Sequence, residues 1–146
     1  MPNPVTVINS APSYSHGVTG MQAKFTYDGI RVRYLDKSIE FYTKVLGMKV
    51  TGRGKIEKTR GETVGLQSQE DGFTLELNYY ESDSPYSIDY VPGEGLDHLG
   101  FKVDDLDKAL READAMGYRT TLEMKVEGGR WAYIEDPNGI WIELFA

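Results

Sequence analysis

Three residues of this 146-residue chain, His98, Glu76 and Glu143, carry side chains that commonly bind divalent metal ions. The two glutamates stand in similar segments, Gly72–Leu77 and Gly139–Leu144. One imidazole and two carboxylates directed at one point repel or desolvate one another unless a proton or a cation lies between them. Imidazole and carboxylate together suit Zn, Ni, Co, Mn or Fe. The residue types therefore predict a divalent transition-metal site, provided that the fold brings these side chains together.

An internal repeat gives the reason to expect that they meet. The segment Ile30–Lys37 returns 71 residues later as Phe101–Lys108, and the two glutamate segments are likewise copies of each other. The repeat places Tyr27 at the position equivalent to His98, and it makes the two glutamates equivalent. If the copies pack with approximate two-fold symmetry, these four side chains converge on the axis.

The elements that must position these side chains follow the same pattern in each copy. Apolar residues at helical spacing predict helices over 35–46 and 106–116, each ended by a glycine. Asp36 is a candidate N-cap of the first helix, and Asp105 or Asp107 of the second. Strands are predicted around residue 30 and at 49–53, 62–67, 73–78, 98–103, 119–124, 130–134 and 140–145. The sequence therefore predicts an α+β fold of two βαβββ modules side by side.

The two ends of the chain differ in pattern. Residues 1–20 mix Pro, Ser, Asn and Gly without periodicity and lack the basic start and apolar stretch of a signal peptide. We interpret them as a loose N-terminal extension and take Met21 as the hypothetical start of the native protein. One domain is expected over 21–146, with the following parts: module one at about 25–80, a connector rich in Ser, Asp, Pro and Gly at about 81–95, and module two at about 96–146.

Composition excludes several classes of function. With 23 acidic residues against 16 Lys and Arg, the chain has a formal net charge of −7. Such a chain offers no basic surface for nucleic acid or an anionic membrane. No apolar run approaches the ~20 residues that span a bilayer. The absence of cysteine excludes a disulfide scaffold, a thiolate zinc site and a cysteine nucleophile. We expect a soluble, cytoplasmic protein that acts on a small molecule.

Several motifs occur in a fixed order along the chain. They are Ile30-Arg31-Val32, Leu35-Asp36-Lys37-Ser38, Phe41-Tyr42, Leu46-Gly47, Leu75-Glu76-Leu77, Asp97-His98-Leu99-Gly100-Phe101, and Asp136-Pro137-Asn138-Gly139 with Trp141-Ile142-Glu143-Leu144. Together they resemble the domains of the vicinal-oxygen-chelate superfamily, from Phe25 to Ala146. The ending is most similar to glyoxalase I (lactoylglutathione lyase). The resemblance implies that the two modules form a curved eight-stranded sheet.

The resemblance also implies a ligand set. Glyoxalase I enzymes use four protein ligands, two from each module, around one Zn or Ni ion. Glu76, His98 and Glu143 match three of them, and Tyr27 stands where the family has a histidine. A phenol, with a pKa of ~10, rarely binds a divalent ion as phenolate. We therefore expect a three-ligand site for one Ni, Zn, Co or Mn ion, with Tyr27 as part of the substrate pocket.

The activity implied by the resemblance is a proton transfer. Glu143 would move a proton between adjacent carbons of a hemithioacetal formed from a thiol and methylglyoxal. Arg31 matches a family contact to the glutathione carboxylate, and an anionic substrate is expected. Lys102 and Trp141 lie on the faces of the strands that carry His98 and Glu143, and they complete the predicted substrate-binding set. Tyr80 stands where those enzymes carry Asn, which leaves the identity of the thiol open.

Other functions remain open. Another enzyme of the superfamily, an epimerase or a thiol transferase, could use the same ligands. A non-catalytic binding protein of the bleomycin-resistance type would need no metal, and Tyr27 favours this alternative. An extradiol dioxygenase needs two histidines, whereas only His98 is available in the patterned chain. Each candidate ligand also has a plain structural alternative, either an exposed carboxylate or a hydrogen-bonded histidine.

A homodimer is the expected assembly. Bacterial-type relatives often build each site from the modules of two different chains. The sequence leaves open whether Glu76 meets Glu143 within one chain or across two.

Overall fold

The computed structural model describes residues 27–94, 96, 98–126 and 129–146. The expected N-terminal extension, with Met21 and His16, lies outside these described residues.

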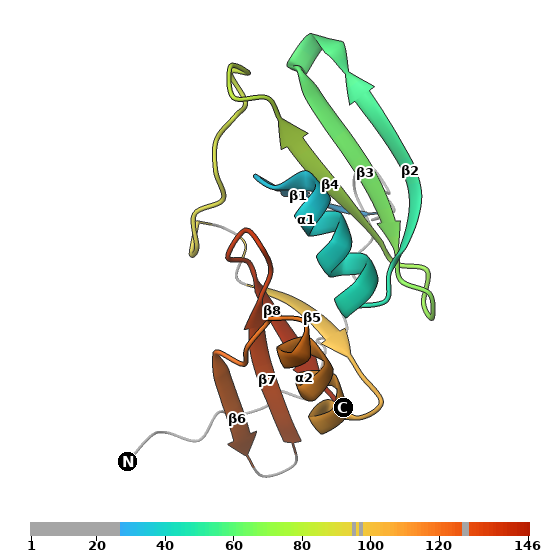
Figure 1. The fold of residues 1–146 in the computed structure, drawn as a ribbon, viewed down its shortest axis with the longest axis vertical. Helices are drawn as coiled ribbons and strands as arrows, with labels where there is room; N and C mark the ends of the chain where they lie inside the picture. Colours follow the sequence, from blue (N-terminus) through green and yellow to red (C-terminus); the bar gives the residue numbers. More distant parts are fainter. Residues whose placement is uncertain (1–26, 95, 97, 127–128) are drawn as a thin grey trace, which may run out of the picture.

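Each half of the chain folds as a strand, a helix and three further strands (Figure 1). The first module comprises β1 (Asp28–Arg31), α1 (Leu35–Glu40) continued by one π-helical turn (Phe41–Val45), β2 (Lys49–Ile56), a 3-10 turn (Glu57–Thr59), β3 (Gly61–Gln67) and β4 (Thr74–Tyr80). The second comprises β5 (His98–Lys102), α2 (Leu106–Ala115), β6 (Leu122–Val126), β7 (Gly129–Glu135) and β8 (Trp141–Phe145). The predicted α+β class and the two βαβββ modules are confirmed.

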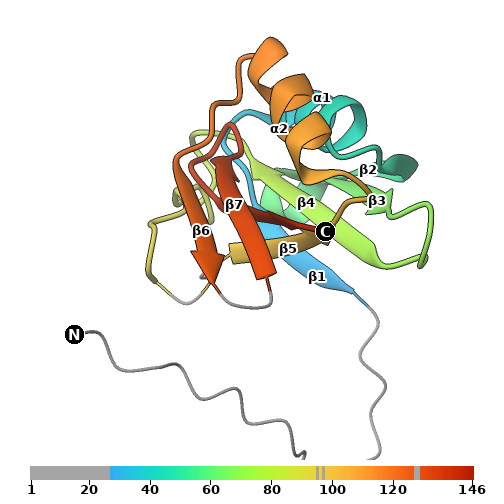
Figure 2. The same cartoon turned by 90° about the horizontal axis from the view of Figure 1, so that it is seen from below.

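The eight strands form two four-stranded sheets, not the single curved eight-stranded sheet that the family resemblance implied. Their orders are β1-β4-β3-β2 and β5-β8-β7-β6. In each sheet the first strand pairs in parallel with the last, and the remaining pairs are antiparallel. The two helices lie on the same side of the sheets (Figure 2). The opposite faces of the sheets therefore remain for the polar side chains that alternate with the core.

The core lies between the helices and one face of each sheet. Its fully buried members alternate along the strands, as period-two patterning requires. They include Val64, Leu66, Leu77, Ala132, Ile134, Ile140 and Ile142, with Phe41 and Tyr42 from the first helix. None of the helices in the described part of the chain is long and apolar enough to cross a membrane.

The two helix starts differ from each other. The side chain of Asp105 accepts a hydrogen bond from the Lys108 amide at 2.9 Å, which confirms one of the two caps predicted for α2. The predicted Asp36 cap is wrong. Helix α1 begins at Leu35, so Asp36 lies inside its first turn, where its charge favours the helix dipole instead. Both helical segments are followed by glycines with positive φ, as predicted.

A buried hydrogen-bond network joins the modules. The loop between β7 and β8 carries Asp136, which accepts a bond from the Tyr42 hydroxyl at 3.1 Å. The amide of Asn138 donates to Asp136 at 2.7 Å and to the Ser38 hydroxyl at 3.1 Å. Burial raises the pKa of Asp136 above its ordinary value, and burial together with the Asp136 charge raises that of Tyr42. We call these four residues the inter-module clamp.

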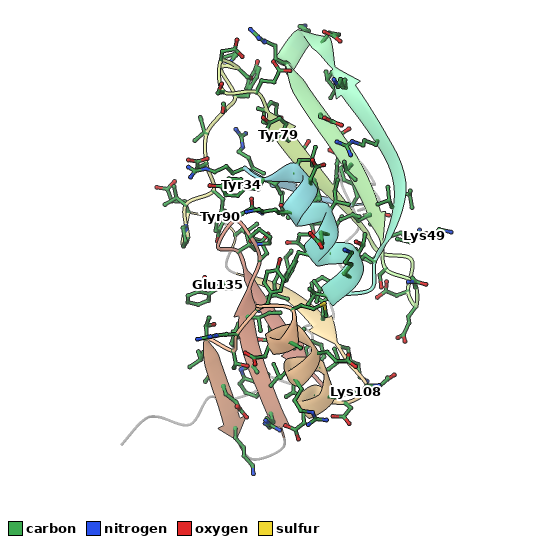
Figure 3. All side chains as sticks on the ribbon, viewed as in Figure 1. Tyr34, Lys49, Tyr79, Tyr90, Lys108 and Glu135 are labelled. Atoms are coloured by element: carbon green, nitrogen blue, oxygen red, sulfur yellow. The ribbon has the colours of Figure 1, made fainter. Side chains whose placement is uncertain are left out.

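The connector runs along the first module before it reaches the second. The Ser84 hydroxyl donates to the Thr59 carbonyl at 2.7 Å. The Tyr90 hydroxyl donates to the Leu96 carbonyl at 3.0 Å. Figure 3 places Tyr90 at the level where the two modules meet. The clamp thus joins the two modules, and the connector is tied to the first module through Ser84.

Candidate functional site

Three side chains gather on one face of the second sheet. Nε2 of His98 lies 3.6 Å from Oε2 of Glu143. The Tyr133 hydroxyl donates a hydrogen bond to the same carboxylate oxygen. The rings of His98 and Tyr133 meet edge to face, with centroids 5.6 Å apart. The side chains of His98 and Glu143 are 35% and 22% exposed, so a small ligand can reach them. We call these residues the His98–Glu143–Tyr133 cluster.

The strand register explains why these residues meet. In the pairing of β5 with β8, Gly100 stands opposite Glu143, and His98 lies two residues earlier on the same face. In the pairing of β7 with β8, Tyr133 stands directly opposite Glu143. The two residues that flank Glu143 in β8 are buried in the core, so its own side chain points to the other face. The alternation found in the sequence therefore places both predicted ligands of this module correctly on one face.

Tyr133 was not among the predicted site residues. The sequence did indicate which face it occupies, because Trp131 and Tyr133 alternate with the core residues Ala132 and Ile134. What the sequence could not supply was the pairing of strands, which alone puts Tyr133 opposite Glu143.

Glu76 occupies the equivalent place in the first sheet. Gly29 stands opposite it in β1 and Gly65 in β3. Because Gly65 has no side-chain hydroxyl, it cannot donate to Glu76 the kind of hydrogen bond that Tyr133 donates to Glu143. An added Cβ at Gly29 would lie 3.2 Å from the side-chain nitrogen of Asn78, and one at Gly65 would lie 2.9 Å from the Thr51 hydroxyl. The first module therefore presents Glu76 beside small polar side chains, and the second presents Glu143 among aromatic rings.

Within the described residues of one chain, the two glutamates do not join one ligand set. Among the described residues, no three His, Asp or Glu side chains form a group that could hold a metal ion. His98 and Glu143 supply one nitrogen and one oxygen donor side by side, and both donor types suit a divalent transition metal. The donor types of this pair therefore suit such an ion. A third protein ligand would have to come from another residue.

Tyr27 stands directly before β1 and is 52% exposed. Its position two residues before Gly29 is the counterpart of His98 two residues before Gly100. The predicted equivalence of these two positions therefore follows the register of the two sheets.

Arg31 lies in a corner formed by two tyrosines. Its guanidinium stacks on the Tyr80 ring, 4.9 Å from the centroid, and donates to the backbone carbonyl of Tyr86. The two rings lie 5.8 Å apart. The Tyr80 ring therefore covers one face of the guanidinium, and the Tyr86 carbonyl occupies one of its donor groups.

Of the remaining predicted substrate residues, Trp141 stands opposite His98 in the pairing of β5 with β8, whereas Lys102 lies at the other end of β5. Lys102 is exposed and lines a cleft of about 690 Å³, together with His98, Asp28 and Phe73. This cleft separates β5 from the first module. Trp141 is 43% exposed, and its ring meets Tyr133 edge on, with centroids 6.1 Å apart.

Known proteins resemble this chain in sequence and in fold. The sequence profile of the Glyoxalase/Bleomycin resistance protein/Dioxygenase superfamily matches residues 22–144. A lactoylglutathione lyase of Shigella flexneri is 34% identical over 120 residues, which is 79% of this chain and 86% of that protein. A probable chloroplastic lactoylglutathione lyase of Arabidopsis thaliana is 36% identical over 119 residues, 78% of this chain. The match spans only 33% of the length of that plant protein.

A solved structure of a glyoxalase I is also similar to this chain in fold. The trypanothione-dependent glyoxalase I of Leishmania major superposes with a TM-score of 0.69 at 27% identity, over 84% of this chain and 86% of that one.

Proposed function

This chain belongs to the glyoxalase/bleomycin resistance protein/dioxygenase superfamily, and on that premise we propose that it is a metal-dependent lyase of the glyoxalase I type. Its substrate is an anionic hemithioacetal of a thiol and methylglyoxal. The observation that carries the proposal is the contact between His98 and Glu143 on an accessible sheet face. Relatives named lactoylglutathione lyase, at 34–36% identity, support it.

The proposed metal site takes ligands from two copies of the chain. His98 and Glu143 of one copy hold a Ni, Zn, Co or Mn ion together with Glu76 of a second copy. Two features support this arrangement. Glu76 joins no ligand group within the described part of a single chain. Gly29 and Gly65 stand opposite it in the two neighbouring strands, so no side chain from either of these positions covers it.

Glu143 moves the proton in the proposed reaction. One carboxylate oxygen removes the proton from the carbon that bears sulfur, and the proton returns to the adjacent carbon. A bound divalent ion would polarise the two substrate oxygens as a Lewis acid. His98 and Tyr133 hold the Glu143 carboxylate on the open side of the sheet, where its side chain is 22% exposed and a substrate can reach it.

Arg31 binds the anionic end of the substrate in this proposal. A guanidinium pairs well with a carboxylate because its donors are fixed in a plane. Tyr80 and Tyr86 flank this position. Tyr80 stands where glyoxalase I enzymes carry an asparagine. Tyr27, Lys102 and Trp141 are proposed to line the pocket around the reacting carbons.

Metal analysis and turnover of the Glu143→Gln variant test the proposal together. The wild-type protein is expected to hold divalent metal and to convert the hemithioacetal of methylglyoxal with glutathione or another thiol. Glu143→Gln should lose turnover and keep its melting temperature, because the amide accepts no proton and retains the shape of the side chain. Glu112→Gln, on the exposed side of α2, is the matched control. Retained turnover in Glu143→Gln would contradict the assignment of the base.

The second candidate is a binding protein of the bleomycin-resistance type. Tyr27 favours it, because the histidine that completes the family ligand set is missing. This candidate is accepted if added metal neither binds nor raises the melting temperature. An epimerase or a thiol transferase of the same superfamily is accepted instead if metal binds and no thiol supports turnover of methylglyoxal.

A further inference from the structure

The equivalent glutamates of the two modules have different neighbours in the adjacent antiparallel strand. Glu76 and Glu143 each stand in the strand at the centre of a sheet, and each faces a residue of the preceding antiparallel strand. That residue is Gly65 in the first module and Tyr133 in the second. Only Glu143 therefore receives a phenolic hydrogen bond across the strands.

We propose that Tyr133 is a positioning residue that fixes the Glu143 carboxylate for metal binding. The inference rests on the proposed function, because it assumes that Glu143 is a metal ligand. Tyr133 does not itself contact the metal or the substrate in this proposal. It acts only through the oxygen that it shares with His98.

The surroundings of Tyr133 hold its hydroxyl in place. Its ring packs edge on against His98 on one side, at 5.6 Å, and against Trp141 on another, at 6.1 Å. These contacts restrict the ring, so the position of its hydroxyl oxygen is restricted as well. A hydroxyl fixed in this way selects the carboxylate orientation that also lies 3.6 Å from Nε2 of His98.

Fixing the carboxylate matters most where one chain supplies few ligands. Partners that hydrogen-bond to metal ligands typically contribute about 10–100-fold to metal affinity. Here the fourth family ligand is replaced by Tyr27. Loss of the Tyr133 hydroxyl leaves both donor atoms in place, but it frees the carboxylate to rotate away from His98. We therefore expect weaker metal binding without loss of the fold.

Cobalt titration of the full-length apoprotein tests this role. Co²⁺ binding is followed by visible absorption, with wild type, Tyr133→Phe and Tyr34→Phe compared. Phe keeps the ring, and with it the packing against His98 and Trp141, so the melting temperature should not change. Tyr34 stands before α1 on the first module and is 48% exposed (Figure 3), which makes it the matched control.

Each outcome decides something. A Co²⁺ dissociation constant raised about 10–100-fold in Tyr133→Phe, with a changed absorption spectrum, supports the role, provided that Tyr34→Phe behaves as wild type. Equal binding by Tyr133→Phe and wild type overturns the positioning role and leaves the proposed function intact. Failure of the wild type to bind Co²⁺ overturns both proposals.

Discussion

The side-chain amide of Asn138 donates a hydrogen bond to the Ser38 hydroxyl over 3.1 Å, and the two residues belong to different modules. The same amide donates to Asp136 at 2.7 Å, and its carbonyl oxygen accepts from the Arg33 backbone amide at 2.8 Å. One asparagine in a turn of the second module thus satisfies three polar groups at the junction. The Asp136-Pro137-Asn138-Gly139 turn therefore also links the two halves of the chain.

Removing this link should lower stability. Asn138→Ala deletes three hydrogen bonds, one of them to a buried carboxylate, and is expected to lower the free energy of unfolding by about 2–3 kcal/mol. Chemical denaturation at neutral pH followed by circular dichroism measures the change. Asn78→Ala is the matched control, since its amide makes one longer bond, at 3.3 Å, to the Glu76 carbonyl. Equal losses in the two variants would contradict the linking role.

Stability should fall steeply in alkali because of Tyr42. Burial, with the Asp136 charge as a smaller cause, raises the pKa of Tyr42 well above its ordinary value of 10.0. As pH rises through 10.0, Tyr42 therefore loses its proton in the unfolded chain but keeps it in the folded protein. Unfolding then becomes easier as pH rises from 10.0 toward the folded pKa, whereas below 10.0 the contribution is fully present.

The Tyr42→Phe variant separates this effect from other titrations. It should be less stable at neutral pH, because it lacks the bond to Asp136, but it should lose less stability than wild type between about pH 9 and 11. Tyr86→Phe, at a half-exposed position, should follow the wild-type curve. Parallel wild-type and Tyr42→Phe curves above pH 10.0 would refute the assignment.

A site shared between two copies predicts complementation between inactive variants. Neither Glu76→Gln nor Glu143→Gln should bind metal at full strength or turn over alone. When the two are unfolded together and refolded as a mixture, each mixed dimer has one site with both glutamates intact. About a quarter of the wild-type activity should return, because half of the dimers are mixed and each carries one good site of two. No recovery would show that the glutamates do not meet across chains.

Arg31 should affect substrate binding more than turnover. Arg31→Ala is expected to raise KM for an anionic substrate about 10–100-fold with little change in kcat, because it removes a charge-assisted pair made before and during the reaction. The KM of Arg31→Lys should lie between those of wild type and Arg31→Ala, because lysine keeps the charge but loses the planar donors. Arg119→Ala, at an exposed position after α2, is the control. An unchanged KM in Arg31→Ala would remove Arg31 from the binding site.

Local pattern was enough to predict most of the fold. The alternation around Glu143 identified the buried and open faces of β8, and both helices end before the predicted glycines. The Asp36 cap failed because helix α1 begins at Leu35, with Tyr34 at the N-cap position, two residues earlier than the capping pattern indicated. A shift of two residues lies within the usual uncertainty of helix ends.

The site was harder to predict because it depends on contacts between distant strands. Tyr133 and Glu143 are neighbours only through the antiparallel pairing of β7 with β8. The corner around Arg31 depends on where the connector returns to the first module, which places the Tyr86 carbonyl at the guanidinium. Neither spacing nor periodicity specifies such contacts.

Both tryptophans of the chain, Trp131 and Trp141, lie in neighbouring strands of the second module. Their fluorescence is therefore a local reporter of that half, because the first half carries tyrosine and phenylalanine but no tryptophan. An emission change on adding a ligand would report on the sheet that carries Glu143. Loss of emission before loss of ellipticity would reveal the second half opening ahead of the first.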